Sequence, residues 1–241
     1  MTPEETAAAT ADAISGIASR FMTDGNTFKY GASIGFQGLD FYVTGRGGVL
    51  GDVDADVVSA CFAFFNPETV RAQWELGCKV MPPKAAAAEF AKAAYAWAER
   101  SLPDDLELAR LAELAGKVVD GASPAGAPIF AGWRNLPVPT DARSAAIHHL
   151  NGLRELRGGL HNGAVLATGM APLEALVVRT PQMAPIFGWM ADLPDAEPHK
   201  ASWQTAESAT NRAFGRVFEA LSSDERAEFS QLVLAADKAS A

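Results

Sequence analysis

Apolar residues recur every three or four positions along most of the chain, and the alternating pattern of half-buried strands is almost absent. A first helix is predicted to begin at Pro3, because Thr2 and Glu5 occupy the outer positions of a capping box. Further helices are predicted at 57–65, from 66 to Gly77, and at 83–100, 104–119 and 141–157. The pattern therefore predicts an all-α fold.

Gly, Pro, Ser and Ala dominate residues 121–139, a composition typical of a loop. We therefore expect an N-terminal helical half at 1–122, a linker at 123–139 and a C-terminal half at 140–241. Two short apolar segments, 160–168 and 172–179, follow Gly158-Gly159 and are separated by three residues, which is the outline of a helix-turn-helix unit. The remaining helices are expected at 181–191, about 202–221 and 224–238.

The charge of the chain disfavours some kinds of binding partner. The chain has 29 acidic and 20 basic side chains, for a formal charge of -9, and its basic residues cluster only at Arg154 and Arg157. Such a surface repels phosphate backbones and anionic lipid heads. We therefore expect neither a nucleic-acid nor a membrane partner.

Two cysteines, Cys61 and Cys78, lie far apart, and only four histidines are present. This set favours neither a disulfide framework nor a zinc site, so no metal is expected. The acidic N-terminus lacks the pattern of a secretory signal, and no apolar run is long enough to cross a membrane. A cytoplasmic location is the expectation, and no cofactor is indicated.

Two blocks of sequence carry a resemblance to a known family. In the first, Tyr42 precedes Arg46 by four positions and Leu50-Gly51 follows; the second runs from Leu153 to His161 as Leu-Arg-Glu-Leu-Arg-Gly-Gly-Leu-His. In order and spacing they resemble an actinobacterial family of helix-turn-helix proteins with two winged-helix-like halves. Leu156 and Gly159 depart from the family pattern, which has a histidine and an acid there.

The likeness covers residue 10 to about 180, and beyond it the family's second wing is truncated here. It implies a winged-helix-derived, two-lobed helical domain and a set of candidate residues. It implies no reaction.

The predicted helix 141–157 carries the main candidate site. His148 and Glu155 are seven positions apart, so they point within about 20° of each other and lie roughly 10 Å apart, with Asn151 and Gly152 between them. They can therefore line one groove. His161, placed after the predicted double-glycine turn, could return to Glu155 and act as a general base. In the alternative reading, Glu155 pairs with Arg154 or Arg157, and His161 caps the turn.

Arg46 lies between an aromatic helix containing Tyr42 and the glycine-rich segment 45–51. An arginine so placed can hold a carboxylate or a phosphate bidentately. The alternative is an ion pair with Asp40 or Asp52. The glycine-rich segment lacks the Lys-Ser/Thr of a P-loop, which favours a tight turn between helices.

The best candidate recognition helix, 172–179, has one acid and one base among apolar residues, a composition that suits a buried helix. We therefore expect binding, or also enzymatic conversion, of a small apolar or anionic metabolite in an interhelical pocket. Its predicted catalytic residues are His148, Glu155 and His161, and its predicted ligand-binding residues are Tyr42, Arg46, Asn151, Arg154 and Arg157. The alternative is a transcription regulator that acts through a homodimer or a protein partner.

Overall fold

A computed structural model describes residues 1–190 and 192–241. These residues form twelve α-helices and four 3₁₀ helices and contain no β-strand, which confirms the all-α fold. The α-helices are α1 (Pro3–Thr23), α2 (Gly25–Ser33), α3 (Leu39–Gly47), α4 (Ala55–Cys61), α5 (Pro67–Val80), α6 (Pro83–Ser101), α7 (Leu108–Gly121), α8 (Pro128–Arg134), α9 (Ala142–Ala167), α10 (Pro172–Arg179), α11 (Lys200–Gly215) and α12 (Ser223–Ala239). The 3₁₀ helices are η1 (Gly48–Leu50), η2 (Pro181–Met183), η3 (Glu197–His199) and η4 (Arg216–Ala220).

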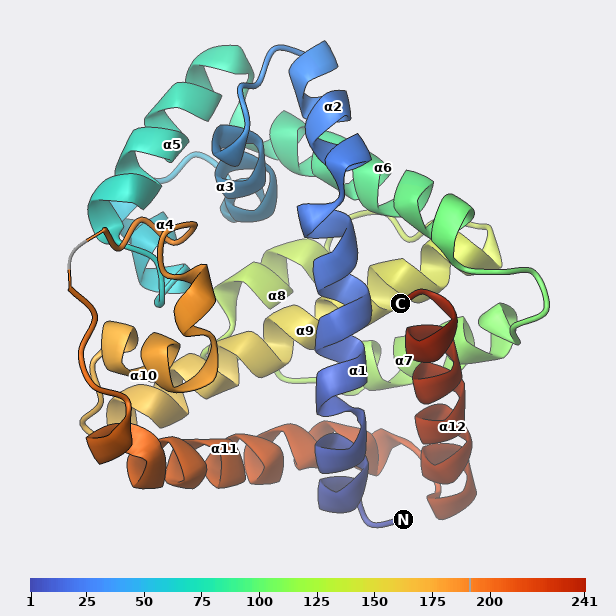
Figure 1. The fold of residues 1–241 in the computed structure, drawn as a ribbon. Coiled ribbons are helices and arrows are strands. Elements are labelled where there is room, and N and C mark those ends of the chain that lie inside the picture. Colours follow the sequence, from blue (N-terminus) through green and yellow to red (C-terminus); the bar gives the residue numbers. More distant parts are fainter. Residues whose placement is uncertain (191) are drawn as a thin grey trace.

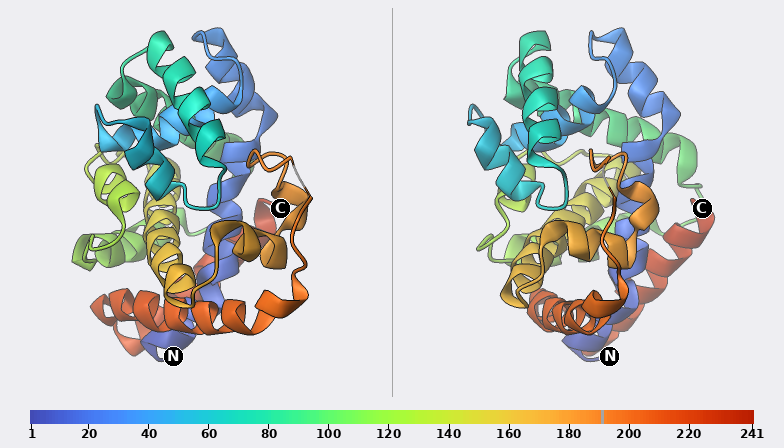
Figure 2. Two further views of the ribbon diagram at one scale, coloured as in Figure 1. Left: turned by 90° about the vertical axis from the view of Figure 1, so that its left-hand side faces the viewer. Right: turned by 60° about the vertical axis from the view of Figure 1, so that its left-hand side comes forward.

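The long helix α9 is the centre of the fold. Helices α1, α6, α7, α8 and α11 pack around it, and Figure 1 shows α1 crossing it in the middle of the molecule. In Figure 2, α2, α3 and α5 lie toward one end of the molecule and α11 lies at the other end. A residue of α9 can therefore meet side chains from either end of the chain.

Local capping explains where several helices begin. The Thr2 hydroxyl accepts from the N–H of Glu5 at 3.2 Å, and the Glu5 carboxylate accepts from the N–H of Thr2 at 2.8 Å. The side chains of Asn66 and Asp141 likewise accept backbone N–H groups at the starts of α5 and α9. These three predicted starts are confirmed.

The principal hydrophobic core draws on both predicted halves of the chain. Phe21 and Phe90 come from the first half, and Leu150 and Phe214 come from the second. The predicted linker is not a simple loop, because α8 forms inside it. Pro128 opens this helix, and its apolar face is buried against α9, with Trp133 only 1% exposed.

Two helices continue through glycines where the sequence predicts an end. A Cβ atom on Gly77 would lie 1.9 Å from the Thr44 hydroxyl oxygen, so this glycine lets α5 approach α3. Likewise, a Cβ atom on Gly159 would lie 2.7 Å from Cα of Ala127. The predicted turn at Gly158-Gly159 is wrong, because Gly159 provides close packing within a continuous α9.

The glycine-rich segment 45–51 also differs from the predicted tight turn. Gly45 and Gly47 lie within α3, where they contact Phe90 of α6 and Val58 of α4. The segment turns only afterwards, through η1 and Gly51, whose φ is +85°. Most of this stretch is thus a packing surface.

The predicted helix-turn-helix unit is formed by the end of α9, a turn and α10. Gly169 occupies the turn with a φ of +80°, and the second predicted helix coincides with α10. The first is the last part of α9 and not a separate helix. The helix predicted at 181–191 is also wrong. Only η2 forms, because Pro185 has no N–H to continue it; Ala191 lies outside the described residues.

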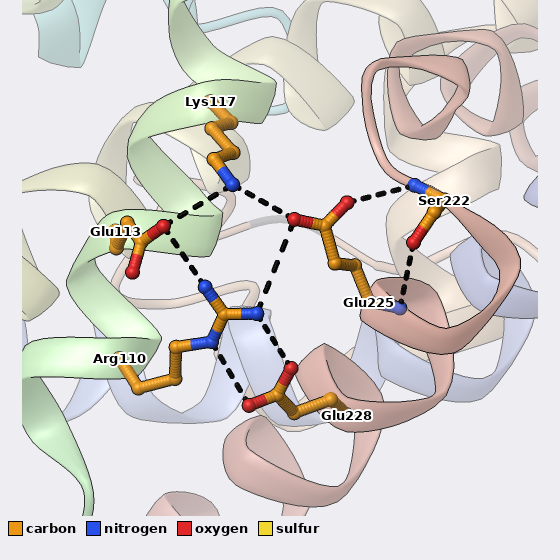
Figure 3. A network of polar contacts seen from close by, with 6 residues as sticks. All are labelled: Arg110, Glu113, Lys117, Ser222, Glu225 and Glu228. Carbon is orange, nitrogen blue, oxygen red and sulfur yellow. Dashed lines mark hydrogen bonds and ion pairs between the residues drawn. The ribbon is translucent and has the colours of Figure 1, made fainter.

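A network of charged side chains joins α7 to α12 on the surface (Figure 3). Arg110 donates to both carboxylate oxygens of Glu228 at 2.9 and 2.8 Å. Lys117 lies 2.7 Å from the Glu225 carboxylate and 3.1 Å from that of Glu113. Glu225 also completes the capping box of α12, so the network helps position the C-terminal helix.

Candidate functional site

A cavity of about 490 Å³, here called the first cavity, lies between α1, α3, α4, α8 and α9. Tyr42 contributes from α3, and Phe187 contributes from the segment after α10. Phe187 stacks on Phe65 with 4.0 Å between ring centroids, and its carbonyl accepts from the N–H of Asn66. The aromatic residues of the wall are Tyr42, Phe62, Phe64, Phe65 and Phe187.

A buried ion pair crosses this wall. Arg46 donates from Nε and Nη2 to the two carboxylate oxygens of Glu155, each at 2.8 Å, and Arg154 donates to the same carboxylate at 2.7 Å. Glu155 is only 3% exposed. The Arg46 guanidinium also lies 4.4 Å from the centre of the Phe62 ring. Arg46 thus joins α3 to α9.

The arginines keep Glu155 charged. Burial alone would raise the pKa of Glu155, but the charges and hydrogen bonds of Arg46 and Arg154 outweigh it and lower that pKa. Burial likewise opposes the charge on Arg46, but Glu155 and Tyr42 together more than offset it, so the pKa of Arg46 is raised. The Asp40 carboxylate accepts backbone N–H groups instead of pairing with Arg46.

His161 does not pair with Glu155, as one of the two predicted readings has it, nor does it cap a turn. Its Nδ1 lies 3.0 Å from the Thr210 hydroxyl oxygen and 3.6 Å from a carboxylate oxygen of Glu207, both on α11. Since α9 has no turn before His161, the ring points toward α11. Burial lowers the pKa of His161 to about 4; Glu207 opposes this, while Arg157 and Arg179 add to it. The ring is therefore neutral at physiological pH.

His148 lies away from the first cavity, although the sequence predicts it in one groove with Glu155. Its Nδ1 is 2.9 Å from the Tyr95 hydroxyl, and its carbonyl accepts from the indole N–H of Trp133. Burial, with a smaller contribution from His149, lowers the pKa of His148 to about 4. The predicted helical phase is not enough, because two turns of α9 separate the residues and place them against different neighbours.

Asn151 is also absent from the wall of the first cavity. It is 1% exposed, and its side-chain oxygen has no hydrogen-bond partner among the described residues. A Cβ atom on the neighbouring Gly152 would be in ordinary contact with Val119, Phe130 and Trp133, at 3.6 to 3.9 Å, so this part of α9 faces other side chains and not an open groove. Asn151 therefore belongs to the packed part of α9.

A second cavity of about 460 Å³ adjoins the first on the side of α11. Phe64, Arg157, His161 and Phe187 line both. Arg157 donates through Nη2 to Glu207 at 2.7 Å and to Asn211 at 3.3 Å. The C-terminal part of α9 therefore separates the first cavity from the second cavity.

Helix α11 contributes residues that were not among the predicted site residues. Trp203, Glu207, Thr210 and Asn211 surround His161 and Arg157, and they are spaced so that they fall on one face of a helix. This combination of polar residues and a tryptophan on one helix face is the sequence signal that could have indicated a contribution of α11 to the site. Which residues of α9 this face of α11 contacts depends on the tertiary packing.

The candidate recognition helix α10 is mostly covered. Among its eight residues, all of them described, only Arg179 is exposed, and its guanidinium lies 2.9 Å from the Asp12 carboxylate. Three consecutive residues of α10, Ala175 to Val177, are buried. Few side chains of this helix are thus free to reach a DNA groove.

Residues 1–190 and 192–241 were also searched for metal sites and for membrane-spanning helices. In this part of the chain, no three His, Cys, Asp or Glu side chains gather closely enough to hold a metal ion. None of its helices combines the length and apolar character that a membrane crossing requires.

Comparison with known proteins identifies a family for this chain. The model of a helix-turn-helix family matches residues 7–197, which include the walls of the first cavity and the unit formed by α9 and α10. Searches of the curated proteins and of the solved structures found no match. Because the family match covers most of the chain, the protein belongs to this helix-turn-helix family.

Proposed function

We propose that the protein binds a small, largely aromatic molecule with an anionic group in the first cavity. The observation that carries this proposal is a cavity of about 490 Å³ whose wall combines five aromatic side chains with arginines. Small-molecule sites are typically concave spaces of about 300–1,000 Å³, mostly apolar, with a few convergent polar groups. Aromatic faces in the wall favour a flat, apolar ligand.

The charge of the wall favours an anion. Arg46, Arg154 and Arg157 line the first cavity together with a single glutamate, Glu155, so positive charge is in excess. Arg46 is neutralised by its bidentate contact with Glu155. Arg157 is likewise paired with Glu207 on α11. Since Arg46 and Arg154 share one carboxylate, we assign the anion to Arg154, and Arg46 to the support of the wall.

Two glycines of α9 give independent support. Gly158 and Gly163 line the first cavity, and a Cβ atom added to either would have no neighbour within 4 Å. Neither has a positive φ, so their conformation does not require glycine. In a helix interior, glycine costs about 1 kcal/mol relative to alanine. Gly163 is exposed, so the space around it is shared with solvent, whereas the space left at the half-buried Gly158 enlarges the cavity and favours a role in ligand binding.

Anilinonaphthalene sulfonate, an aromatic anion whose fluorescence rises in apolar surroundings, tests the proposal. We expect saturable binding of one molecule per chain and a higher melting temperature in its presence. Gly158→Phe should place a ring in the cavity and weaken binding by about tenfold or more.

Gly25→Phe is the matched control, since Gly25 is exposed, has equally open space around its missing Cβ atom and lies outside both cavities. Circular dichroism checks that both variants fold. Unsaturable binding, or equal binding by wild type and Gly158→Phe, would show that the first cavity is not the site.

The second candidate is a transcription regulator that acts through a homodimer or a protein partner. The family match and the exposed apolar side chains of Ile186, Met190 and Leu193 favour it; Met190 is 82% exposed. The charge of -9 and the covered α10 favour a protein partner over duplex DNA. Light scattering would then give twice the 25.4 kDa chain mass, and Met190→Asp would restore the monomer.

A further inference from the structure

His161 stands where the two cavities meet. It lines both, and the rings of Phe64 and Trp203 lie beside it at centroid distances of 5.9 and 4.9 Å. The residue is 6% exposed. Any ligand that extends from the first cavity toward α11 therefore meets the imidazole.

The neighbours of the His161 Nδ1 atom determine which nitrogen of the imidazole ring carries the proton. The Thr210 hydroxyl lies 2.7 Å from the Ala206 carbonyl, which can only accept, so its proton is directed there and its oxygen can accept from His161. The Glu207 carboxylate, 3.6 Å from Nδ1, also favours a proton on that atom. Nδ1 therefore carries the hydrogen, and Nε2 presents a lone pair.

This lone pair is unpartnered. Nε2 of His161 is buried and has no hydrogen-bond partner within the described part of the chain. An unsatisfied buried acceptor is costly, and a ligand that donates a hydrogen bond would remove that cost. An anionic oxygen would instead face a lone pair and be repelled.

Arg157 adds a complementary donor. It precedes His161 by four positions, so both side chains lie on the same face of α9. Its Nε–H is buried and, in residues 1–190 and 192–241, has no acceptor. A hydroxyl is the simplest group that satisfies both atoms, since its oxygen accepts from Arg157 and its hydrogen donates to His161.

We infer that the ligand is a hydroxylated aromatic compound whose hydroxyl donates a hydrogen bond to Nε2 of His161 and accepts one from Nε of Arg157. This inference rests on the proposed function, because it specifies which aromatic molecule the first cavity takes. Thr210 is a positioning residue, since it holds the proton on Nδ1 and thereby leaves Nε2 free to accept.

Three probes that differ at one position test the inference: naphthoate, hydroxynaphthoate and methoxynaphthoate. The methoxy group can accept a hydrogen bond but cannot donate one. Calorimetric titration of the full chain should show that hydroxynaphthoate binds about tenfold more tightly than either of the other two. Binding of anilinonaphthalene sulfonate is measured in parallel as the readout of the proposed function.

The hydroxyl preference should disappear in His161→Phe, which keeps an aromatic ring between Phe64 and Trp203 and removes the acceptor. His149→Phe is the matched control, because His149 is also a buried histidine with an unpartnered ring nitrogen among the described residues but lines neither cavity. It should retain the preference. Thr210→Val, which keeps the imidazole and removes the acceptor at Nδ1, should reduce the preference and decides the matter if His161→Phe does not fold.

The other possible results contradict either the hydroxyl inference or the proposed function. Equal binding of the three naphthoates, binding of the sulfonate without any naphthoate, or a preference that persists in His161→Phe would overturn the hydroxyl inference and leave the first cavity as a ligand site. Failure of all four compounds to bind the wild type would overturn the proposed function, and the inference with it.

Discussion

Two of the sets of ion pairs that join distant helices differ in their exposure to solvent. In the network between α7 and α12 (Figure 3), the side chains are 24% to 52% exposed. In the pair between α3 and α9, Arg46 is 12% exposed at its side chain and Glu155 is 2% exposed. The exposed set contains more pairs, but water can replace any partner that is lost.

The buried set has no such replacement. Glu155 is surrounded by protein, so its charge depends on Arg46 and Arg154. Removal of one partner leaves an uncompensated buried charge or a donor without an acceptor. The number of ion pairs is therefore a poor guide to which of them the fold requires, and burial is a better one.

The largest expected effect is the loss of the buried pair. Arg46→Met should lower the free energy of unfolding by about 3–5 kcal/mol, because it leaves the Glu155 charge with Arg154 alone. Urea denaturation measures this value. Arg46→Met combined with Glu155→Met should recover part of the loss, since the buried carboxylate is then removed and only the more exposed Arg154 keeps a charge. A single variant as stable as the wild type would contradict the importance given to burial.

The next largest effect is expected from acid, which should act on buried histidines before it acts on the exposed network. The pKa of Glu225 is lowered to about 2 by its contacts with Lys117 and Ser222, so the exposed network stays charged at mildly acidic pH. His148 and His161 have pKa values lowered from 6.5 to about 4, mainly by burial. Below pH 6.5 the unfolded chain binds protons at these histidines and the folded chain does not, so stability falls as the pH is lowered toward 4.

Each of the two histidines should contribute on the order of 3 kcal/mol to this decline. The free energy of unfolding, measured in urea from pH 7 to pH 4, should fall less steeply in His161→Phe than in the wild type. A profile that is flat down to pH 4.5 would show that the histidines are not desolvated as their burial implies.

A smaller effect is expected at two adjacent glycines. Gly158→Ala should stabilise the protein by about 0.5–1 kcal/mol, because the new methyl group meets nothing and alanine favours the helix. Gly159→Ala should destabilise it, since the methyl group would lie 2.7 Å from Cα of Ala127. Thermal melts of the two variants decide whether the packing of α9 against Ala127 is as tight as described.

The smallest effect belongs to the exposed network. Glu228→Gln removes one carboxylate from Arg110, which keeps Glu113 as a neighbour. We expect no change in the urea midpoint beyond experimental error at moderate salt, where surface charges are screened. A large shift that disappears in high salt would instead show that the network acts as a unit.

The sequence predicts local features of the fold well. The starts of α1, α5 and α9 depend on Thr2, Asn66 and Asp141, and capping involves only neighbouring residues. The ends predicted at Gly77 and Gly158 are wrong because glycine serves two roles that sequence alone does not separate: it can end a helix, or it can remain within one beside a close contact or an open space. Only the tertiary neighbours distinguish them.

For the candidate site, the sequence predicts some of the residues that line the cavity but not all of their partners. Arg46, Glu155 and His161 all line the first cavity. Glu155 pairs with Arg154, as one of the two predicted readings has it, but the partners of Arg46 and His161 differ from those predicted. The histidine was expected to meet Glu155, and it meets Glu207 and Thr210 instead. No pattern within 141–161 could indicate this, because the partners lie about fifty residues further along the chain.

Gly158 and Gly163 also have a consequence for how ligand size can change between related proteins. Because neither position requires glycine for conformation or for packing, progressively larger side chains could be introduced there without moving the backbone. Each such replacement would reduce the volume of the first cavity and shorten the compound that it can hold, at little cost to folding. The two positions are thus a route by which single mutations could retune ligand selection while the surrounding helices stay in place.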